Sequence, residues 1–264
     1  MLNFLHTFLP SPILLDLGVV KIHWYGLLIA LAVFFCLWLA GRLSRKINLP
    51  QEHVFNLGFY LVVFGLVGAR LWHALFYNFA YFTADPLAII KIWQGGLAIH
   101  GAILAGLITL IVYCRRHGLS FWSVADVLAI VLPLGQSIGR WGNYFNQELF
   151  GRPCAYQWCI PINPANRPDV FVNFQYFQPV FLYESLLDLM LFAGLLWLFK
   201  KQKTTPGLIV LFYLGGYAAI RFITEFWRLD SARLGIFTWV QWLCLVVIAG
   251  SLIGLAKRKK ILYN

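Results

Sequence analysis

The sequence has 264 residues, of which 61% are hydrophobic and 12% charged, and its mean hydropathy is +0.74. Soluble domains carry about 25% charged residues, so this composition excludes an ordinary soluble protein and predicts one embedded in a bilayer. A net charge of +11 would suggest a nucleic-acid partner in a soluble protein. In a membrane protein the basic residues must first be assigned to the two sides, and we expect no nucleic-acid partner.

Seven apolar segments are long enough to cross a bilayer as helices, which takes about 20 residues each. They are residues 24–40, 54–76, 97–114, 121–138, 180–199, 208–226 and 236–256. We therefore expect an all-α polytopic membrane protein with seven transmembrane helices. The sequence has no fixed-period repeat, and its loops are too short for a soluble domain, so residues 1–264 are expected to form a single membrane-embedded domain.

The basic residues are concentrated in alternate loops. If the loop of residues 41–51 is cytoplasmic, twelve of the 21 Lys and Arg residues lie on that side: Arg42, Arg45, Lys46, Arg115, Arg116, Lys200, Lys201, Lys203, Lys257, Arg258, Lys259 and Lys260. The outside loops spread their basic residues over far more sequence. The positive-inside rule then predicts an outside N-terminus and a cytoplasmic C-terminus.

The segments expected outside differ in character. Residues 1–20 lack a basic start and contain Pro10, Pro12 and Asp16, which argues against a cleaved signal peptide and favours a segment along the membrane surface. Residues 78–96 resemble a short interfacial helix with an aromatic anchor. Residues 143–179 are rich in Pro, Asn and aromatic residues, so we expect an irregular loop that covers the functional site.

Two of the five cysteines, Cys154 and Cys159, share this outside loop. An oxidising compartment would favour a disulfide between them, but such a short loop must also satisfy strict bridge geometry, so two free thiols remain an equal alternative. The other three fall in separate helices. The cysteines therefore do not suggest a metal site.

Several ionisable side chains fall within the apolar segments, where each is costly unless it is paired, solvated or near a membrane face. They are Arg70, Asp126, Glu184, Asp188, Arg221 and Glu225. For any one of them, internal pairing that fixes helix packing explains the residue as well as a function does. Position favours a function for those at the outer ends of helices.

In the predicted topology, three arginines and two histidines lie toward the outer leaflet: Arg70, Arg140, Arg221, His73 and His100. Three guanidinium groups at one level suit a large anion, and a phospholipid headgroup is the anion available there. Tyr217, Arg221 and Glu225 recur at intervals of four residues and share one helical face, so they can line a common cavity. The simpler alternative is an Arg221–Glu225 pair that bridges helices.

The densest polar cluster near a membrane boundary is the segment G-R-W-G-N-Y-F-N-Q-E-L-F-G at residues 139–151. Its three glycines permit tight turns, and Arg140, Asn143, Asn146 and Glu148 offer hydrogen-bond donors and an acceptor within a few residues. Such a turn can cradle a phosphoryl-glycerol head. A helix-capping turn is an equal competitor, since Asn and Gly also end helices.

This segment resembles the signature G-R-x-G-N-F-x-N-x-E-x-x-G of the bacterial prolipoprotein diacylglyceryl transferases, with Tyr144 in place of the usual Phe. Further matches are H-W-Y-G at residues 23–26, G-G-L-A-I-H-G at 95–101 and G-Y-A-A-I-R-F-I-T-E-F-W-R at 216–228. The resemblance spans nearly the whole chain. The family also has seven helices and an outside N-terminus, which the charge bias predicts independently.

The resemblance implies transfer of a diacylglyceryl group from phosphatidylglycerol to the lipobox cysteine of a prolipoprotein signal peptide, with a thioether formed and glycerol phosphate released. It implies no metal or cofactor, and a multi-pass protein of the bacterial inner membrane, surrounded by membrane lipids, with its active site toward the periplasm. By position, His100 matches the family's essential histidine, and Arg140 and Arg221 match arginines at the phospholipid head. The other residues expected in the site are Tyr25, Asn143, Asn146, Glu148, Gly151, Tyr217 and Glu225.

The chemistry of a thiol agrees with these roles. A thiol with a pKa of about 8.5 is mostly unreactive at neutral pH and benefits from a base or from nearby cations. His100 can supply the base, and Arg221 is a second candidate that would activate the thiol electrostatically. The arginines would neutralise the phosphate as the bond to glycerol breaks.

The sequence departs from the family pattern at a few positions. Gln178 replaces a histidine before the fifth predicted helix, Ala102 replaces a glycine after His100, and W-V-Q at residues 239–241 replaces M-G-Q. A second hypothesis therefore stays open, that of a divergent paralogue that binds phospholipid or peptide with another specificity or without catalysis.

Overall fold

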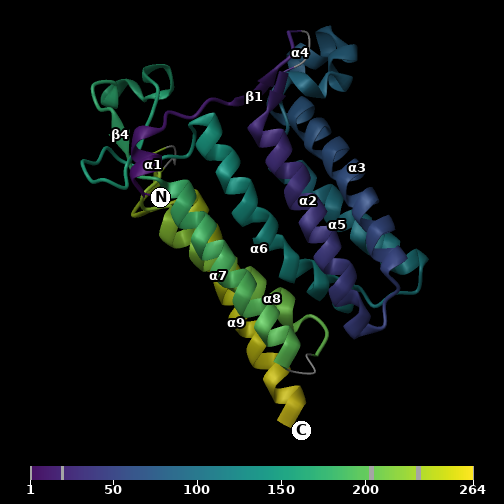
Figure 1. Ribbon diagram of the computed structural model, residues 1–264. Helices are drawn as coiled ribbons and strands as arrows, with labels where there is room; N and C mark the ends of the chain where they lie inside the picture. Colours follow the sequence, from purple (N-terminus) through teal and green to yellow (C-terminus); the bar gives the residue numbers. More distant parts are fainter. Residues whose placement is uncertain (1, 19–20, 202–204, 230–232, 264) are drawn as a thin grey trace. The chain divides into compact units, whose positions relative to one another are not determined.

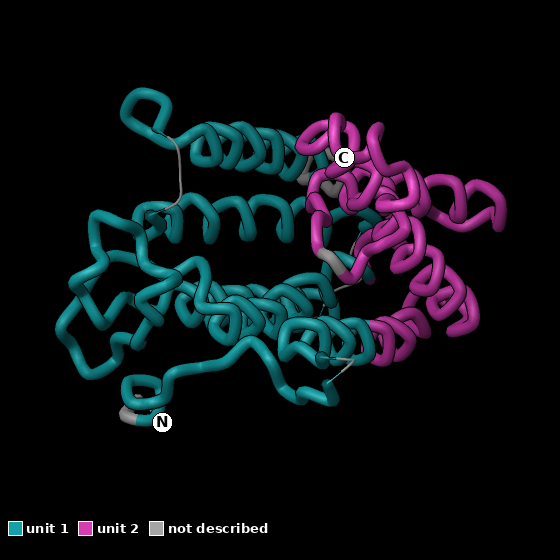
Figure 2. Tube along the Cα trace, turned by 90° about the horizontal axis from the view of Figure 1, so that it is seen from above, with its two compact units in different colours: residues 1–36, 128–264 teal, residues 37–127 magenta. Residues whose placement is uncertain are grey.

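The computed structural model describes residues 2–18, 21–201, 205–229 and 233–263, so Lys203 of the predicted cytoplasmic loops lies outside the described residues. The chain forms two compact units (Figure 2). Unit 1 comprises residues 1–36 and 128–264, and unit 2 comprises residues 37–127. Two long helices, α2 and α6, belong partly to each unit.

Six helices of the described chain are long and apolar enough to cross a membrane (Figure 1). They are α2 (Trp24–Leu43), α3 (Gln51–Phe76), α5 (Ile99–Arg116), α6 (Phe121–Asn146), α7 (Val180–Lys201) and α9 (Trp239–Tyr263). The expected seventh, α8 (Leu208–Thr224), is also apolar but has only 17 residues. Large apolar side chains such as Phe34, Phe59 and Val246 are exposed along these helices, as expected where a protein faces lipid rather than water. The helical, polytopic character predicted from the sequence is confirmed.

In unit 2, helices α3 and α5 pack closely because two glycines face each other. A Cβ atom on Gly68 or Gly101 would collide with the backbone of the other helix. The helices are flanked by η1 (Ser44–Ile47), α4 (Phe79–Ala84), η2 (Pro86–Ile90) and η3 (Ile92–Gln94). The single interfacial helix expected over residues 78–96 is thus three short helices, because Pro86 cannot continue a helix and begins a new turn. Trp93 of this segment, an aromatic side chain suited to anchor it at a membrane surface, is 76% exposed.

In unit 1, helix α8 packs against both α7 and α9, and the three run side by side in Figure 1. The first half of α2 packs on α6 through small residues of α6: Cys36 contacts Gly135, Ile29 contacts Gly139, and the ring of Tyr25 lies on Gly142. Helix α6 runs to Asn146, whereas the sequence predicts an end at residue 138. Its glycines provide a packing face for α2 and do not end the helix.

The loop that follows α6 is irregular, as predicted, and is held by short elements. Strands β3 (Ile160–Pro161) and β4 (Tyr176–Phe177) pair antiparallel, with η4 (Pro164–Asn166) and η5 (Asp169–Phe171) between them. Cys154 and Cys159 form a disulfide, which decides between the two alternatives that the sequence leaves open. Two further hairpins, β1 (Ile13–Asp16) with β2 (Lys21–His23) and β5 (Arg233–Leu234) with β6 (Phe237–Thr238), complete the strands of the described chain.

The N-terminal arm, residues 2–12, docks on this loop through helix α1 (Leu2–Thr7). The ring of His6 stacks on Tyr176 with centroids 4.1 Å apart, and its Nδ1 lies 2.8 Å from the carbonyl oxygen of Cys159. Leu5 is buried in a core cluster with Tyr144, Phe150, Ile160, Ile162, Phe177 and Phe181. The arm is therefore packed against the loop and is not simply a segment along the surface.

Gln147 ties three segments of unit 1 together. Its side-chain Nε2 donates to the carbonyl of Pro10 at 2.6 Å, and its Oε1 accepts from the backbone N–H of Asn163, also at 2.6 Å. The hydroxyl of Tyr144 donates to the carbonyl of Phe8 at 3.3 Å. The end of α6 is thus joined to both the N-terminal arm and the loop that follows α6.

Candidate active site

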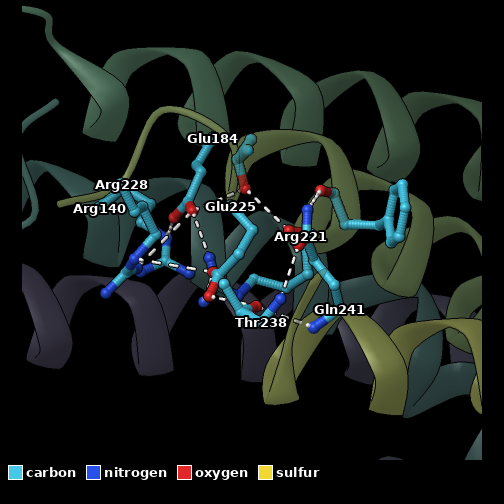
Figure 3. Close-up of polar contacts among 9 residues, drawn as sticks. Arg140, Glu184, Arg221, Glu225, Arg228, Thr238 and Gln241 are labelled. Atoms are coloured by element: carbon cyan, nitrogen blue, oxygen red, sulfur yellow. Dashed lines mark hydrogen bonds and ion pairs between the residues drawn. The ribbon is translucent and has the colours of Figure 1, made fainter. Parts of the chain in front are cut away.

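A buried ion-pair network joins helices α6, α7 and α8 (Figure 3). Glu184 of α7 is at its centre: its Oε2 lies 2.6 Å from Nε of Arg140 on α6, and its Oε1 accepts from Nη1 of Arg221 on α8 at 2.9 Å. The hydroxyl of Thr224 donates to the same Oε1 at 2.9 Å. One carboxylate therefore holds two arginines that come from different helices.

A second carboxylate, Glu225, completes the network just after α8. Its Oε2 accepts from Nη2 of Arg221 at 2.7 Å, and its Oε1 accepts from the hydroxyl of Thr238 at 3.0 Å. The backbone N–H of Thr238 donates to Oε1 of Gln241 at 3.0 Å, which links the network to the first turn of α9 (Figure 3). The simpler prediction of an Arg221–Glu225 pair is confirmed, but within a larger network.

Burial strengthens the electrostatic interactions between these charges. The side chains of Glu184 and Glu225 are 2% and 0% exposed, and those of Arg140 and Arg221 are 17% and 16% exposed. Arg228 lies a little farther away, with nitrogens 3.9 Å from both carboxylates. The network combines three guanidinium groups with two carboxylates, and the buried carboxyl of Asp188, one turn after Glu184 on α7, interacts electrostatically with Arg140 and Arg221. In a low-dielectric setting, guanidinium groups that keep unused N–H donors can still bind an anion.

The two central arginines are engaged differently. Arg221 directs both of its Nη groups at carboxylates, whereas Arg140 contacts Glu184 through Nε. In the described part of the chain, no hydrogen bond occupies the Nη groups of Arg140. These two groups form a fork that can bind two oxygens of a phosphate in a bidentate manner.

The signature segment is a helix followed by a tight turn, in which two asparagines bond to one carboxylate. The amide nitrogens of Asn143 and Asn146 donate to Oε1 of Glu148 at 2.8 Å and 3.3 Å. The N–H of Glu148 donates back to the carbonyl of Asn143 at 3.0 Å. Gln147 and Leu149 adopt left-handed φ values of 53° and 56°. The helix-capping interpretation thus describes this turn, because α6 continues to Asn146 and the asparagines are bonded to Glu148.

Two glycines of the signature are required by close contacts. The ring of Tyr25 occupies the space beside Gly142 that a Cβ would fill. At Gly151, a Cβ would lie 2.9 Å from the carbonyl oxygen of Trp227, and the N–H of Gly151 donates to the carbonyl of Gln178 at 2.9 Å. Gly151 therefore lets the chain pass between the end of α8 and the start of α7. Gln178, the departure from the family's histidine, makes this contact through its backbone.

Tyr217 lies one turn before Arg221 on α8 and stacks on Tyr213, with ring centroids 5.9 Å apart. Nine of the ten predicted site residues belong to unit 1. His100 belongs to unit 2, where it is the second residue of α5 and is exposed, with its ring 6.1 Å from that of Trp72.

Arg70 of unit 2 is bonded to backbone through Nε, Nη1 and Nη2, so its N–H donors are all in use. Its guanidinium donates to five carbonyl oxygens of the segment that follows α4, at Ile89, Gly95, Gly96, Ala88 and Lys91. The suggestion that three arginines together hold one headgroup is therefore wrong for Arg70. Its role is to fold residues 86–96 over the end of α3.

Sequence reasoning missed several residues of the network as site residues. Glu184, Thr224, Arg228, Thr238 and Gln241 all take part. The signal for Glu184 was present, because it is a carboxylate inside an apolar segment. Thr238 gives no such signal, since an isolated threonine near a helix start is ordinary.

Comparison with known proteins identifies the family of the chain. A family model described as prolipoprotein diacylglyceryl transferase matches residues 12–257. Over 236 residues the chain is 43% identical to the phosphatidylglycerol–prolipoprotein diacylglyceryl transferase of Thermosynechococcus vestitus, covering 89% of this chain and 88% of the relative. The enzyme of the same name from a Nostoc species is 41% identical over 260 residues, covering 97% and 91%. The chain therefore belongs to the prolipoprotein diacylglyceryl transferase family.

Proposed function

We propose that this protein transfers the diacylglyceryl group of phosphatidylglycerol to the cysteine thiol of a prolipoprotein. A sulfur–carbon bond forms, the carbon–oxygen bond between diacylglycerol and phosphate breaks, and glycerol phosphate leaves. The observation that carries the proposal is the buried network in which Glu184 and Glu225 hold Arg140 and Arg221. The names of the relatives supply the two substrates.

The arginines act on the phosphate. In the ground state they bind its oxygens, with the free Nη fork of Arg140 as the main contact. As the carbon–oxygen bond breaks, negative charge grows on the departing phosphate, and fixed guanidinium groups in a site of low dielectric stabilise that charge more than they stabilise the substrate. Glu184 and Glu225 fix the orientation of the arginines, so little reorganisation is needed during the reaction.

The thiol must lose its proton before or during attack. His100 is the first candidate for the base, and activation of the thiolate by Arg221 is the second. Tyr25, Tyr217 and the Asn143–Glu148 turn are proposed to shape the substrate site.

The proposal includes a topology. Residues 1–264 form one membrane-embedded domain in which α8 joins the six longer helices as a seventh span, with the N-terminus outside and the C-terminus in the cytoplasm. The concentration of basic residues in alternate loops supports this arrangement. The site then lies toward the periplasmic face of a bacterial inner membrane, beneath residues 143–179. The acceptor is a lipobox cysteine in a signal peptide.

The first test is complementation of a strain depleted of its own diacylglyceryl transferase, with mass spectrometry of a reporter lipoprotein. We expect the mass of a diacylglyceryl group on the reporter cysteine. Purified protein in detergent should likewise convert a lipobox peptide and phosphatidylglycerol, and His100→Asn and Arg140→Ala should abolish turnover. Glu52→Gln, an exposed carboxylate at the start of α3, is the control and should stay active.

The main alternative is a paralogue that binds the lipid or the peptide without catalysis. Binding of phosphatidylglycerol with no adduct, from protein that is well expressed and inserted, would favour that alternative. Full activity in both the His100 and Arg140 variants would instead refute the proposed site.

A further inference from the structure

A cationic cavity adjoins the ion-pair network in unit 1. Its volume is about 270 Å³. Its polar lining consists of Arg152, Glu225, Arg228, Arg233, Thr238 and Gln241. Four of these residues, Glu225, Arg228, Thr238 and Gln241, also belong to the network drawn in Figure 3. The cavity and the network therefore share part of one wall.

The charges of the lining favour an anion. Three guanidinium groups face one carboxylate, and that carboxylate, Glu225, already accepts hydrogen bonds from Arg221 and Thr238. Arg228 is mostly buried between the two sites, with 10% of its side chain exposed, whereas Arg152 and Arg233 are exposed. The arginines of the cavity thus differ in exposure, with Arg228 buried at the network and Arg152 and Arg233 at the surface.

The position of the outer arginines is fixed by the backbone. Arg152 directly follows Gly151, and its carbonyl accepts from the N–H of Gln178 at 3.0 Å. Arg233 pairs with Thr238 in the β5–β6 hairpin. Two different segments, the outside loop and the hairpin before α9, are thereby held at one cavity.

The size of the cavity selects the ligand class. Pockets for drug-sized molecules have volumes of about 300–1,000 Å³, so this one suits a small polar anion and not the acyl chains of a lipid. Phosphate groups are the anions for which arginine clusters are best suited, because a guanidinium binds two phosphate oxygens at once.

We propose that this cavity binds the phosphate monoester released by the transfer reaction and conducts it from Arg140 and Arg221 toward the surface. The inference rests on the proposed function. In the reaction the thiolate forms the sulfur–carbon bond and the electron pair of the carbon–oxygen bond goes to phosphate. A diester with one negative charge thus becomes a monoester with about 1.5 to 2 negative charges at pH 7. Because of this added charge, the three arginines of the cavity should bind glycerol phosphate more tightly than the headgroup of phosphatidylglycerol.

Direct binding is the first test, because it needs no turnover. Purified protein in detergent is titrated with glycerol phosphate and with inorganic phosphate, and binding is followed by calorimetry. We expect both to bind, and Arg152→Gln with Arg233→Gln to weaken binding by about tenfold or more, the loss expected when charge-assisted hydrogen bonds are removed. Lys21→Gln removes one positive charge from an exposed hairpin away from the cavity lining and should leave binding unchanged. No binding to the wild-type protein, or equal binding to the double variant, overturns the proposal.

Kinetics distinguish the product from the donor headgroup. We expect the double variant to show a higher inhibition constant for glycerol phosphate while KM for phosphatidylglycerol stays within about twofold, a change too small to signal the loss of a headgroup contact. A raised KM with an unchanged inhibition constant would assign the cavity to the lipid headgroup and overturn the product site. If the wild-type protein binds phosphate through Arg152 and Arg233 but transfers nothing, the proposed function fails while the anion site stands.

Discussion

The ion pair between Arg140 and Glu184 gives the sharpest test of the site. Changing Glu184 to Gln keeps the shape of the side chain but removes the charge that faces both Arg140 and Arg221. Breaking a buried pair by removing one partner costs about 3–5 kcal/mol. The arginines are 17% and 16% exposed, so solvent screens part of the effect and we expect a value near the lower limit, about 3 kcal/mol.

A double-mutant cycle isolates the contact itself. The free energy of unfolding is measured for wild type, Arg140→Gln, Glu184→Gln and the double variant by reversible unfolding in mixed detergent. Residues in one ion-pair network show coupling of about 0.5–3 kcal/mol, and a distance of 2.6 Å between Nε and Oε2 predicts the upper half of that range.

Arg167 provides the control cycle with Glu184. Its guanidinium donates to the carbonyls of Ile162 and Val172 and shares no partner with Glu184, so the two changes should add within about 0.5 kcal/mol. In parallel, kcat/KM for a lipobox peptide should fall about a hundredfold in Glu184→Gln, because each factor of ten corresponds to about 1.4 kcal/mol of lost transition-state stabilisation. Zero coupling between Arg140 and Glu184, with normal activity, would refute the network.

Three further predictions concern single positions. Gly151→Ala should lower the free energy of unfolding by about 1–3 kcal/mol and reduce activity, because the added Cβ meets the backbone at the end of α8. Gly194→Ala is the control: it has open space beside it and should be neutral or slightly stabilising in the same unfolding assay. Arg70→Lys should lower the free energy of unfolding because an ammonium cannot reach five carbonyls. KM for phosphatidylglycerol should not rise in this variant. A rise in KM without a loss of stability would show that Arg70 binds the headgroup after all. Cys154→Ser should cost about 2 kcal/mol by the loop-entropy relation for a short loop, and adding reductant to this variant should cause no further loss, unlike its effect on wild type.

The general architecture could be predicted from the sequence because apolar length and composition decide it. The helices of the apolar segments were predicted to within a few residues at most ends, since a run of apolar residues bounded by charges leaves few alternatives. The end of α6 was predicted about two helical turns too early. Gly139 and Gly142 look like helix breakers in the sequence, and only the neighbouring α2, with Tyr25 against Gly142, explains why the helix continues.

Three members of the ion-pair network were singled out from the sequence, but the contacts between them were not predicted. Arg140, Arg221 and Glu225 were identified from position and resemblance, while Glu184, which joins them, was seen only as a charge in an apolar segment. Arg70 shows the opposite error. Its sequence position is that of a headgroup ligand, but five carbonyls converge on it, and a convergence of backbone groups from a folded segment leaves no trace in residue types.

The docking of the N-terminal arm has a consequence for biosynthesis. His6 contacts Cys159, and Gln147 contacts Pro10, across separations of 153 and 137 residues. His6 and Pro10 therefore cannot reach these partners until residues 147 and 159 have been synthesised. Contacts of such long range form late, because the intervening chain must be ordered first. The arm would then dock late in folding. The turn that contains Glu148 would gain its contact with the arm, through Gln147 and Pro10, only at that stage.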